Sequence, residues 1–188
     1  MQYEYRKSCS TKEFYYLIDD AFKSMKDYRR AMKEKLIEKA FEEKIMLAVT
    51  DINGCELCNA FHTQNAKKFG VSQIEIGNII SGGIKIGTTK EDIALDFAKH
   101  YALENGDYSD VKWNKLIEAY GEETAKGILG VIRIIMMGNA YGIAAGALLN
   151  RFKLKPVKRS TLFNELSITL NVILFVPFLG IKRGLLKA

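Results

Sequence analysis

Apolar side chains recur every three or four residues along most of the chain, a spacing that places them on one face of an α-helix. The first such series follows Ser-Thr-Lys-Glu at residues 10–13, which has the pattern of a capped helix start. A second series extends from Met32 toward residue 50, and Asp-Ile-Asn-Gly at 51–54 then indicates a turn. The first 54 residues are therefore predicted to form two helical segments.

The rest of the chain repeats this pattern, with short polar or glycine-containing segments between the apolar series. Further helices are predicted over about residues 55–68, 73–80, 90–104, 110–120, 122–152 and 160–181. The alternation of apolar and polar residues that marks a half-buried strand is absent from the sequence. Only Pro156 and Pro177 could interrupt a helix as proline does, and both lie near the C-terminus. The pattern predicts an all-α fold, a bundle of about seven or eight helices.

The basic segment 153–159, which contains Pro156, divides the chain into two parts. We expect residues 1–155 to form the helical domain that carries the chemistry. We expect residues 156–188 to add an apolar C-terminal helix that packs on this domain or forms a subunit interface.

The predicted last helix has about the length of a membrane span. Polar residues and a proline interrupt its apolar run, however, and such groups are costly in lipid. They are Asn164, Glu165, Ser167, Thr169, Asn171 and Pro177. A packing or interface helix is therefore favoured, while reversible membrane contact through Lys182, Arg183 and Lys187 stays open.

Three glycines at a spacing of four, Gly138, Gly142 and Gly146, lie along one side of the predicted helix 122–152. Such a stripe lets another backbone approach closely, in a membrane or in a soluble bundle. Because Arg133 and Asn139 interrupt the surrounding apolar run, we predict a tight helix–helix contact in a soluble bundle.

Composition agrees with one globular protein of ordinary polarity: 188 residues, 48% hydrophobic and 27% charged. The net charge of +6 is mild, and Lys and Arg alternate with Glu and Asp, as solvated helix faces do. We therefore expect no nucleic-acid partner. Residues 1–12 contain no apolar segment of a secretory signal, so a cytoplasmic, reducing location is expected.

The candidate chemistry lies at Cys55, Cys58 and His62. At about 100° per residue, Cys58 lies about 60° and His62 about 20° from Cys55 around a helix, so all three share one face. Cys55 follows the Asn53-Gly54 turn, in the first helical turn, where the helix dipole favours a thiolate. We expect Cys55 to be the more exposed sulfur. Two thiols beside a titratable imidazole form a dithiol/disulfide device.

Two other interpretations compete with the redox one. The same three residues could be zinc ligands, but Cys9 and His100, the other candidate ligands, are isolated in the sequence. The two cysteines could also be inert core residues. A thioredoxin fold is disfavoured because no strand precedes the motif.

Residues 43–62 read Glu-Lys-Ile-Met-Leu-Ala-Val-Thr-Asp-Ile-Asn-Gly-Cys-Glu-Leu-Cys-Asn-Ala-Phe-His. This segment resembles the signature of the alkylhydroperoxidase D-like (AhpD-like) / carboxymuconolactone decarboxylase superfamily, in which a Glu heads an apolar helix and Asn-x-Cys-x-x-Cys-x-x-x-His follows a turn. The resemblance covers about residues 40–82. It implies an all-α, AhpD-like helical bundle that assembles as a homo-oligomer, commonly a trimer or hexamer.

The resemblance also implies an activity: a thiol-dependent peroxidase or disulfide oxidoreductase that reduces hydroperoxides without a metal or other cofactor. Cys58 would attack the peroxide, Cys55 would resolve the disulfide, and Glu43 and His62 would relay protons. The electron donor would be a dithiol on a lipoyl or thioredoxin-like protein. The local sequence Glu-Glu-Lys at 42–44 alone, without the resemblance, predicts that Glu43 is a solvated carboxylate.

One departure from the family pattern bears on activity. Some peroxidase members carry a histidine between the two cysteines, where this chain has Glu56 and Leu57. An acidic residue beside a thiol disfavours the thiolate. The decarboxylase branch lacks the cysteine pair, so Cys55 and Cys58 argue against lactone decarboxylation. A non-catalytic oligomeric binding protein with a redox-sensitive cysteine pair and a zinc-binding protein stay as alternatives, and Cys9 is expected to be a spare thiol.

Overall fold

The computed structural model describes residues 7–81, 89–155 and 160–184. The regular elements of this part of the chain are eight helices and no strand, which confirms the all-α prediction. They are α1 (Thr11–Lys33), α2 (Lys39–Asn53), α3 (Glu56–Lys68), α4 (Gln73–Ile80), α5 (Lys90–Leu103), α6 (Asp110–Tyr120), α7 (Glu122–Phe152) and α8 (Leu162–Lys182).

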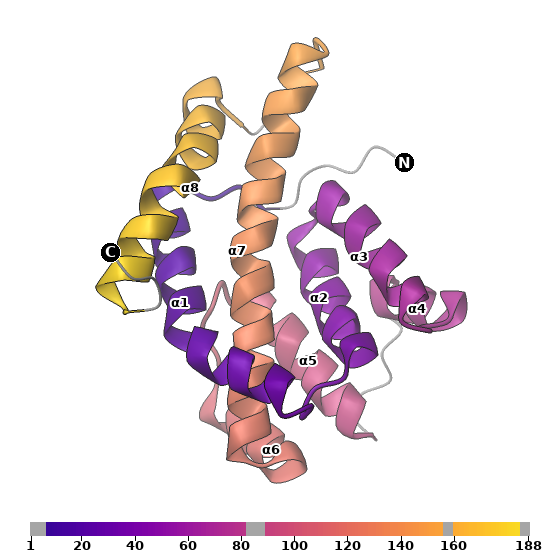
Figure 1. Ribbon diagram of the computed structural model, residues 1–188. Coiled ribbons are helices and arrows are strands. Elements are labelled where there is room, and N and C mark those ends of the chain that lie inside the picture. The colour runs from indigo at the N-terminus through magenta and orange to yellow at the C-terminus, as the bar shows by residue number, and fades with distance from the viewer. Residues whose placement is uncertain (1–6, 82–88, 156–159, 185–188) are drawn as a thin grey trace.

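Helix α7 is the central element of the bundle. It runs the length of the molecule, with α1 and α8 on one side, α2, α3 and α4 on the other, and α5 and α6 toward one end (Figure 1). The main core lies where α2, α5 and α7 meet, and its fully buried side chains include Ile45, Leu47, Phe97, Ile128 and Ile132. The site described below is built on the part of α2, α3 and α7 that adjoins this core.

Two glycines bring α1 and α7 into close contact. A Cβ atom on Gly130 would lie 2.8 Å from the Cβ of Tyr28, and one on Gly127 would collide with Ala31. Real Cβ atoms do not approach this closely, so the two helices pack at a distance that only glycine permits. Close packing was predicted at Gly138, Gly142 and Gly146, whereas the contacts of Gly127 and Gly130 were not predicted.

The helix starts follow the capping signals in the sequence. Ser10, Ser72 and Thr89 each cap a helix through a reciprocal capping box with Glu13, Glu75 or Asp92. Each box satisfies backbone N–H groups that would otherwise have no partner at the helix start.

The first predicted boundary is wrong. The second helical segment was expected from Met32, whereas α1 continues to Lys33 and α2 begins at Lys39. Lys35 adopts the left-handed conformation (φ 57°), and the N–H of Leu36 donates to the carbonyl of Ala31 at 2.9 Å. This is a Schellman ending with Lys where Gly is usual, so the break carries no Gly or Pro signal.

Helix α8 packs on α1 and α7 around a second, smaller core, which contains Phe14, Ile18, Ala144, Ile168 and Leu179. Both α7 and α8 are long and apolar enough to cross a membrane. The most apolar window of α7 is 67% buried inside the protein, however, whereas that of α8 is only 17% buried. Helix α7 is thus a core helix, and α8 lies at the surface. Pro177 falls inside α8.

Candidate redox site

A tight turn between α2 and α3 places the first cysteine. Gly54 ends α2 in the left-handed conformation (φ 74°), and its N–H donates to the carbonyl of Thr50 at 2.8 Å. Cys55 then forms the N-cap of α3, and its sulfur accepts a hydrogen bond from the N–H of Cys58 at 3.3 Å. Cys55 thus lies one residue before the helix rather than in its first turn, in a position that also favours a thiolate.

The two cysteines form a disulfide, with their α-carbons 5.3 Å apart. Cys55 is 1% exposed, whereas Cys58 is only partly buried. The expectation that Cys55 is the more exposed sulfur is therefore wrong. The physical reason is α7: Ile143 packs against Cys55 and covers it. A molecule in solution reaches the pair at Cys58.

Helix α7 approaches the disulfide through Gly142. A Cβ atom at this position would lie 2.7 Å from the sulfur of Cys55 and 2.7 Å from that of Cys58, so only a residue without a side chain fits. One turn earlier, the carbonyl oxygen of Gly138 lies 3.7 Å from the sulfur of Cys58. The predicted glycine stripe thus makes a close contact at Gly142, and its neighbour there is the sulfur pair at the start of α3.

Glu43 on α2 and His62, one turn after Cys58 on α3, form a second pair. The Nδ1 of His62 lies 2.7 Å from the Oε2 of Glu43, and both residues are more than 90% buried. When the carboxylate is ionised it accepts the Nδ1–H bond, which leaves Nε2 as the nitrogen that takes up or gives a proton. The local Glu-Glu-Lys sequence predicts a solvated carboxylate at Glu43, whereas the structure shows a buried carboxylate that is hydrogen-bonded to His62.

A third residue, Asn65, is hydrogen-bonded to this pair and was not predicted. Its Nδ2 donates to the other oxygen of Glu43 at 3.2 Å. Since Asn65 follows His62 by three residues on α3, the two side chains share one helix face, and that spacing was the available signal. The carboxylate is held at both oxygens, which fixes its orientation toward the imidazole.

Within the described residues, the imidazole makes its hydrogen bond to Glu43 and none to either sulfur. The ring also packs edge-on against Phe61, at 5.1 Å between centroids. The structure thus brings the Cys55–Cys58 pair and the Glu43–His62 pair onto neighbouring turns of α2 and α3. The catalytic roles assigned to the four residues stay predictions.

A buried polar network lies behind the site, between α2 and α7. The hydroxyl of Thr50 donates to the Oδ1 of Asn139 at 3.0 Å, and the Nδ2 of Asn53 donates to the sulfur of Met136 at 3.1 Å. In the described part of the chain, the Nδ2 of Asn139 and the Oδ1 of Asn53 are buried with no hydrogen-bond partner. From the sequence, Asn139 was visible only as a polar residue within an apolar run.

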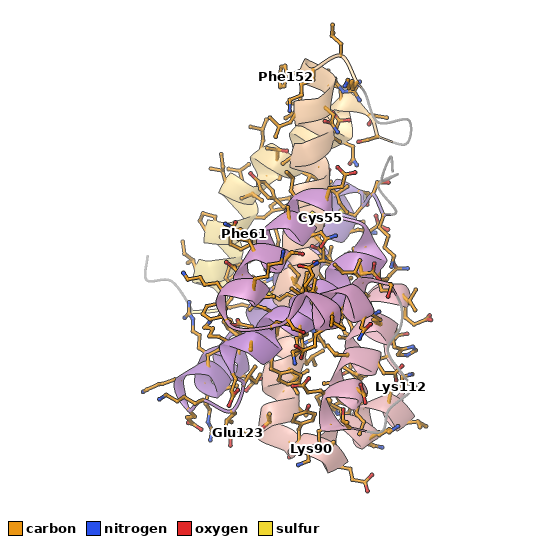
Figure 2. The ribbon with its side chains drawn as sticks, turned by 90° about the vertical axis from the view of Figure 1, so that its right-hand side faces the viewer. Cys55, Phe61, Lys90, Lys112, Glu123 and Phe152 are labelled. Carbon is orange, nitrogen blue, oxygen red and sulfur yellow. A yellow bond between two sulfur atoms is a disulfide. The ribbon has the colours of Figure 1, made fainter. Side chains whose placement is uncertain are left out.

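The outer surface of α3 next to Cys58 is apolar with one charge. Leu57 is 48% and Phe61 is 60% exposed, and Glu56 is exposed as well. Figure 2 shows Phe61 and Cys55 in the same region of the molecule. Because Glu56 is in contact with solvent, water screens its effect on the neighbouring thiol.

A cavity of about 570 Å³ lies on the other side of Ile143, the residue that covers Cys55. Its wall is formed by the segment before α1, by α1, by the end of α2 and by α7, and includes Lys7, Glu13, Asn53 and Met136. Its lining mixes charged, amide and apolar groups.

Cys9 carries a free thiol that lines this cavity. Burial and the nearby carboxylate of Glu13 raise the pKa of Cys9 to about 11, so the thiol is protonated and unreactive near neutral pH. Cys9 does not join the disulfide pair, and His100 lies on α5. No three His, Cys, Asp or Glu side chains in the described ranges gather as metal ligands, so the zinc interpretation finds no ligand set there.

Comparison with known proteins shows which family the chain is similar to. A protein of Bacillus subtilis (strain 168), "Uncharacterized protein YdfG", is 26% identical over 135 residues, which cover 71% of this chain and 92% of that protein. No solved structure gives a significant match. The model of the carboxymuconolactone decarboxylase family matches residues 19–99, the segment that contains α2, α3 and the residues of both pairs. The match over residues 19–99 confirms the resemblance of the Cys-x-x-Cys-x-x-x-His segment to the AhpD-like superfamily, which includes the carboxymuconolactone decarboxylase family.

Proposed function

We propose that the protein is a thiol-dependent peroxidase, in which Cys55 and Cys58 cycle between dithiol and disulfide at the expense of a dithiol donor. The observation that carries the proposal is the Cys55–Cys58 disulfide at the start of α3, one helical turn before His62, which is buried and bonded to Glu43. Disulfide chemistry needs a thiolate, and proton transfer from a thiol needs a base of suitable pKa nearby. The family includes enzymes, which agrees with a catalytic role for these residues.

In the oxidative half-reaction, the thiolate of Cys58 attacks the terminal oxygen of a hydroperoxide. The O–O bond breaks, Cys58 becomes a sulfenic acid, and the leaving alkoxide takes a proton from His62 to form the alcohol. His62 then takes the proton of the Cys55 thiol, and the Cys55 thiolate attacks the sulfur of Cys58. The disulfide forms as hydroxide leaves and takes this proton from His62 to give water. Glu43 stabilises the charge of His62 while the imidazole holds the proton.

In the reductive half-reaction, one thiolate of the donor attacks Cys58, the sulfur that solution reaches. Cys55 leaves as a thiolate, which its N-cap position and the N–H of Cys58 stabilise. The second donor thiol resolves the mixed disulfide, so two electrons pass from the donor to the pair. The exposed apolar surface at Leu57 and Phe61 is where the donor protein would lie.

The expectations that accompany this function are a cytoplasmic location, a lipoyl or thioredoxin-like donor and a homo-oligomeric state. The competing function is a non-catalytic binding protein whose cysteine pair only senses redox conditions. Such a protein would form the same disulfide but would not consume peroxide over repeated cycles.

Hydroperoxide consumption with dihydrolipoamide as the donor tests the proposal. Wild type and Cys9→Ser should turn over many equivalents of peroxide, whereas Cys58→Ser and Cys55→Ser should not. If the wild-type protein consumes one equivalent of peroxide and then stops, while the thiols of the donor remain reduced, the protein is a sensor and not a peroxidase. Equal turnover by all four proteins would exclude the cysteine pair from the mechanism.

A further inference from the structure

The inner side of α8 combines the apolar residues of the smaller core with several polar side chains. Glu165 is fully buried and accepts two hydrogen bonds from Arg151, at 2.7 and 2.8 Å. The Nδ2 of Asn164 donates to the carbonyl of Cys9 at 2.8 Å, and Ser167 shares a hydrogen bond with Thr11 at 2.7 Å. The polar groups that argued from sequence against contact with lipid are therefore turned toward the protein and paired.

The outer side of α8 is apolar. Every exposed residue of this helix except Lys182 is apolar, and six large side chains form a continuous stripe along it: Phe163, Leu166, Leu170, Ile173, Leu174 and Phe178. We call this stripe the α8 apolar face. Phe152, which is 78% exposed, extends it at the end of α7, where Figure 2 shows it at one extreme of the molecule. A helix on the surface of a soluble protein normally exposes a polar face, so we expect this apolar face to be covered by a binding partner.

The C-terminal segment that contains α8 is positively charged. Residues 150–188 hold eight of the chain's 28 Lys and Arg residues and one of its 22 Asp and Glu residues. The rest of the chain therefore carries a net charge of −1, although the whole chain carries +6. In the described part, Lys153 and Lys155 lie before α8 and Lys182 lies at its end, all exposed, and the acidic residue Glu165 is neutralised by Arg151.

We propose that the α8 apolar face binds the surface of an anionic lipid bilayer. An apolar helix face with cations at both ends is the pattern of a helix that lies in the membrane interface, where the side chains enter the acyl boundary and the lysines contact anionic headgroups. A second copy of this chain is a poorer occupant, because any pairing of two such faces brings basic ends together. Spanning is disfavoured because the inner side of α8 is hydrogen-bonded to the protein.

This binding leaves the redox site accessible from solution. Helix α7 separates α8 from α3, so the sulfur pair lies on the side of α7 that faces away from α8 (Figure 1). The inference is independent of the proposed function, since its test reads binding and not turnover.

Flotation with vesicles tests the proposal, using phosphatidylcholine with and without phosphatidylserine. The full-length protein should float with the anionic vesicles, and added salt should weaken the binding. Leu170→Gln combined with Leu174→Gln should reduce the bound fraction at limiting lipid about tenfold or more. The control is Ile74→Gln with Val111→Gln, two apolar residues on α4 and α6 that are more exposed than Leu170 and Leu174, and this variant should bind as wild type does. Circular dichroism and thermal unfolding check that each variant folds.

The charge is tested separately. Replacing Lys153, Lys155 and Lys182 by Gln should lower affinity for the anionic vesicles about fivefold per lysine, whereas Lys67→Gln with Lys68→Gln on α3 should not. A wild-type protein that floats with neither vesicle overturns the proposal. Self-association that Leu170→Gln with Leu174→Gln abolishes, without vesicle binding, overturns it too and identifies the face as a contact between copies.

Discussion

The α-carbon of Gly142 lies so close to the sulfur of Cys58 that a methyl group has no room between them, since a Cβ atom would come within 2.7 Å of that sulfur. The same atom would come equally close to the sulfur of Cys55. The backbone of α7 thus forms one wall of the disulfide. Ile143, the next residue of the same helix, packs against Cys55 and leaves Cys58 as the more exposed cysteine of the pair.

We predict that Gly142→Ala destabilises the oxidised protein. The new methyl group forces α7 or the sulfur pair to shift, at a cost of about 1–3 kcal/mol in the free energy of unfolding. Gly138→Ala is the matched control, because its Cβ would meet Ile135 at an ordinary 3.8 Å, and the better helix propensity of Ala should make it neutral or stabilising. Denaturant unfolding of both variants, oxidised and reduced, measures the effect. Equal changes in the two variants would contradict the role given to Gly142.

We predict that Glu43→Gln lowers peroxide turnover about 100-fold or more, because the amide cannot stabilise a protonated His62. The preceding residue offers a control of similar burial. Glu42 bonds the hydroxyl of Tyr28 and the ammonium of Lys39, away from His62. Glu42→Gln should cost stability, on the order of 1–3 kcal/mol, while turnover per folded molecule stays unchanged. If both variants lose turnover to the same extent, the loss follows from replacing any buried carboxylate on α2, and a proton relay through Glu43 and His62 is contradicted.

We predict that an external thiol joins the chain at Cys58 and not at Cys55, because Cys55 is 1% exposed. Incubation of Cys55→Ser with a mixed-disulfide reagent should give a rapid, stable adduct on Cys58. The reciprocal variant Cys58→Ser should react at least about tenfold more slowly, since its remaining motif sulfur lies under Ile143. Mass spectrometry of the labelled peptides identifies the site. Faster labelling of Cys55 would reverse the assigned order of attack.

We predict that Cys9 alkylates slowly at neutral pH and gains reactivity only as the pH approaches about 11, the raised pKa of its thiol. The unfolded thiol titrates near 9, so between these values the folded chain holds a proton that the unfolded chain has lost. Stability therefore falls as the pH rises through this window. Glu13→Gln should lower the pKa, since the nearby charge is one of its causes. Alkylation rates against pH, in a protein with Cys55 and Cys58 replaced by Ser, provide the measurement.

Much of the fold could be predicted because capping and spacing are local. Ser10, Ser72 and the apolar series that follow them mark helix starts that need no tertiary information. The end of α1 could not be predicted, because a lysine takes the left-handed position that glycine usually occupies. The close contacts of Gly127 and Gly130 could not be predicted either, since they depend on which face of α1 packs against α7.

The candidate site also has features that the local sequence predicts and features that depend on tertiary packing. The helical spacing of Cys55, Cys58 and His62 was enough to place them together, and the family resemblance drew attention to Glu43. The relative exposure of the two sulfurs could not be read locally, because α7, more than 80 residues away in the chain, decides it. Asn65 was missed although its spacing from His62 was visible, since an asparagine on a helix is usually solvated.

Helix α7 acts as a spacer between two surfaces. It is 31 residues long, which corresponds to about 46 Å, and its flanks meet the sulfur pair on one side and α8 on the other. Its thickness, about 10 Å, sets the separation between thiol chemistry and the apolar exterior. Substitutions at exposed positions of α8 are therefore expected to leave the geometry of the sulfur pair unchanged.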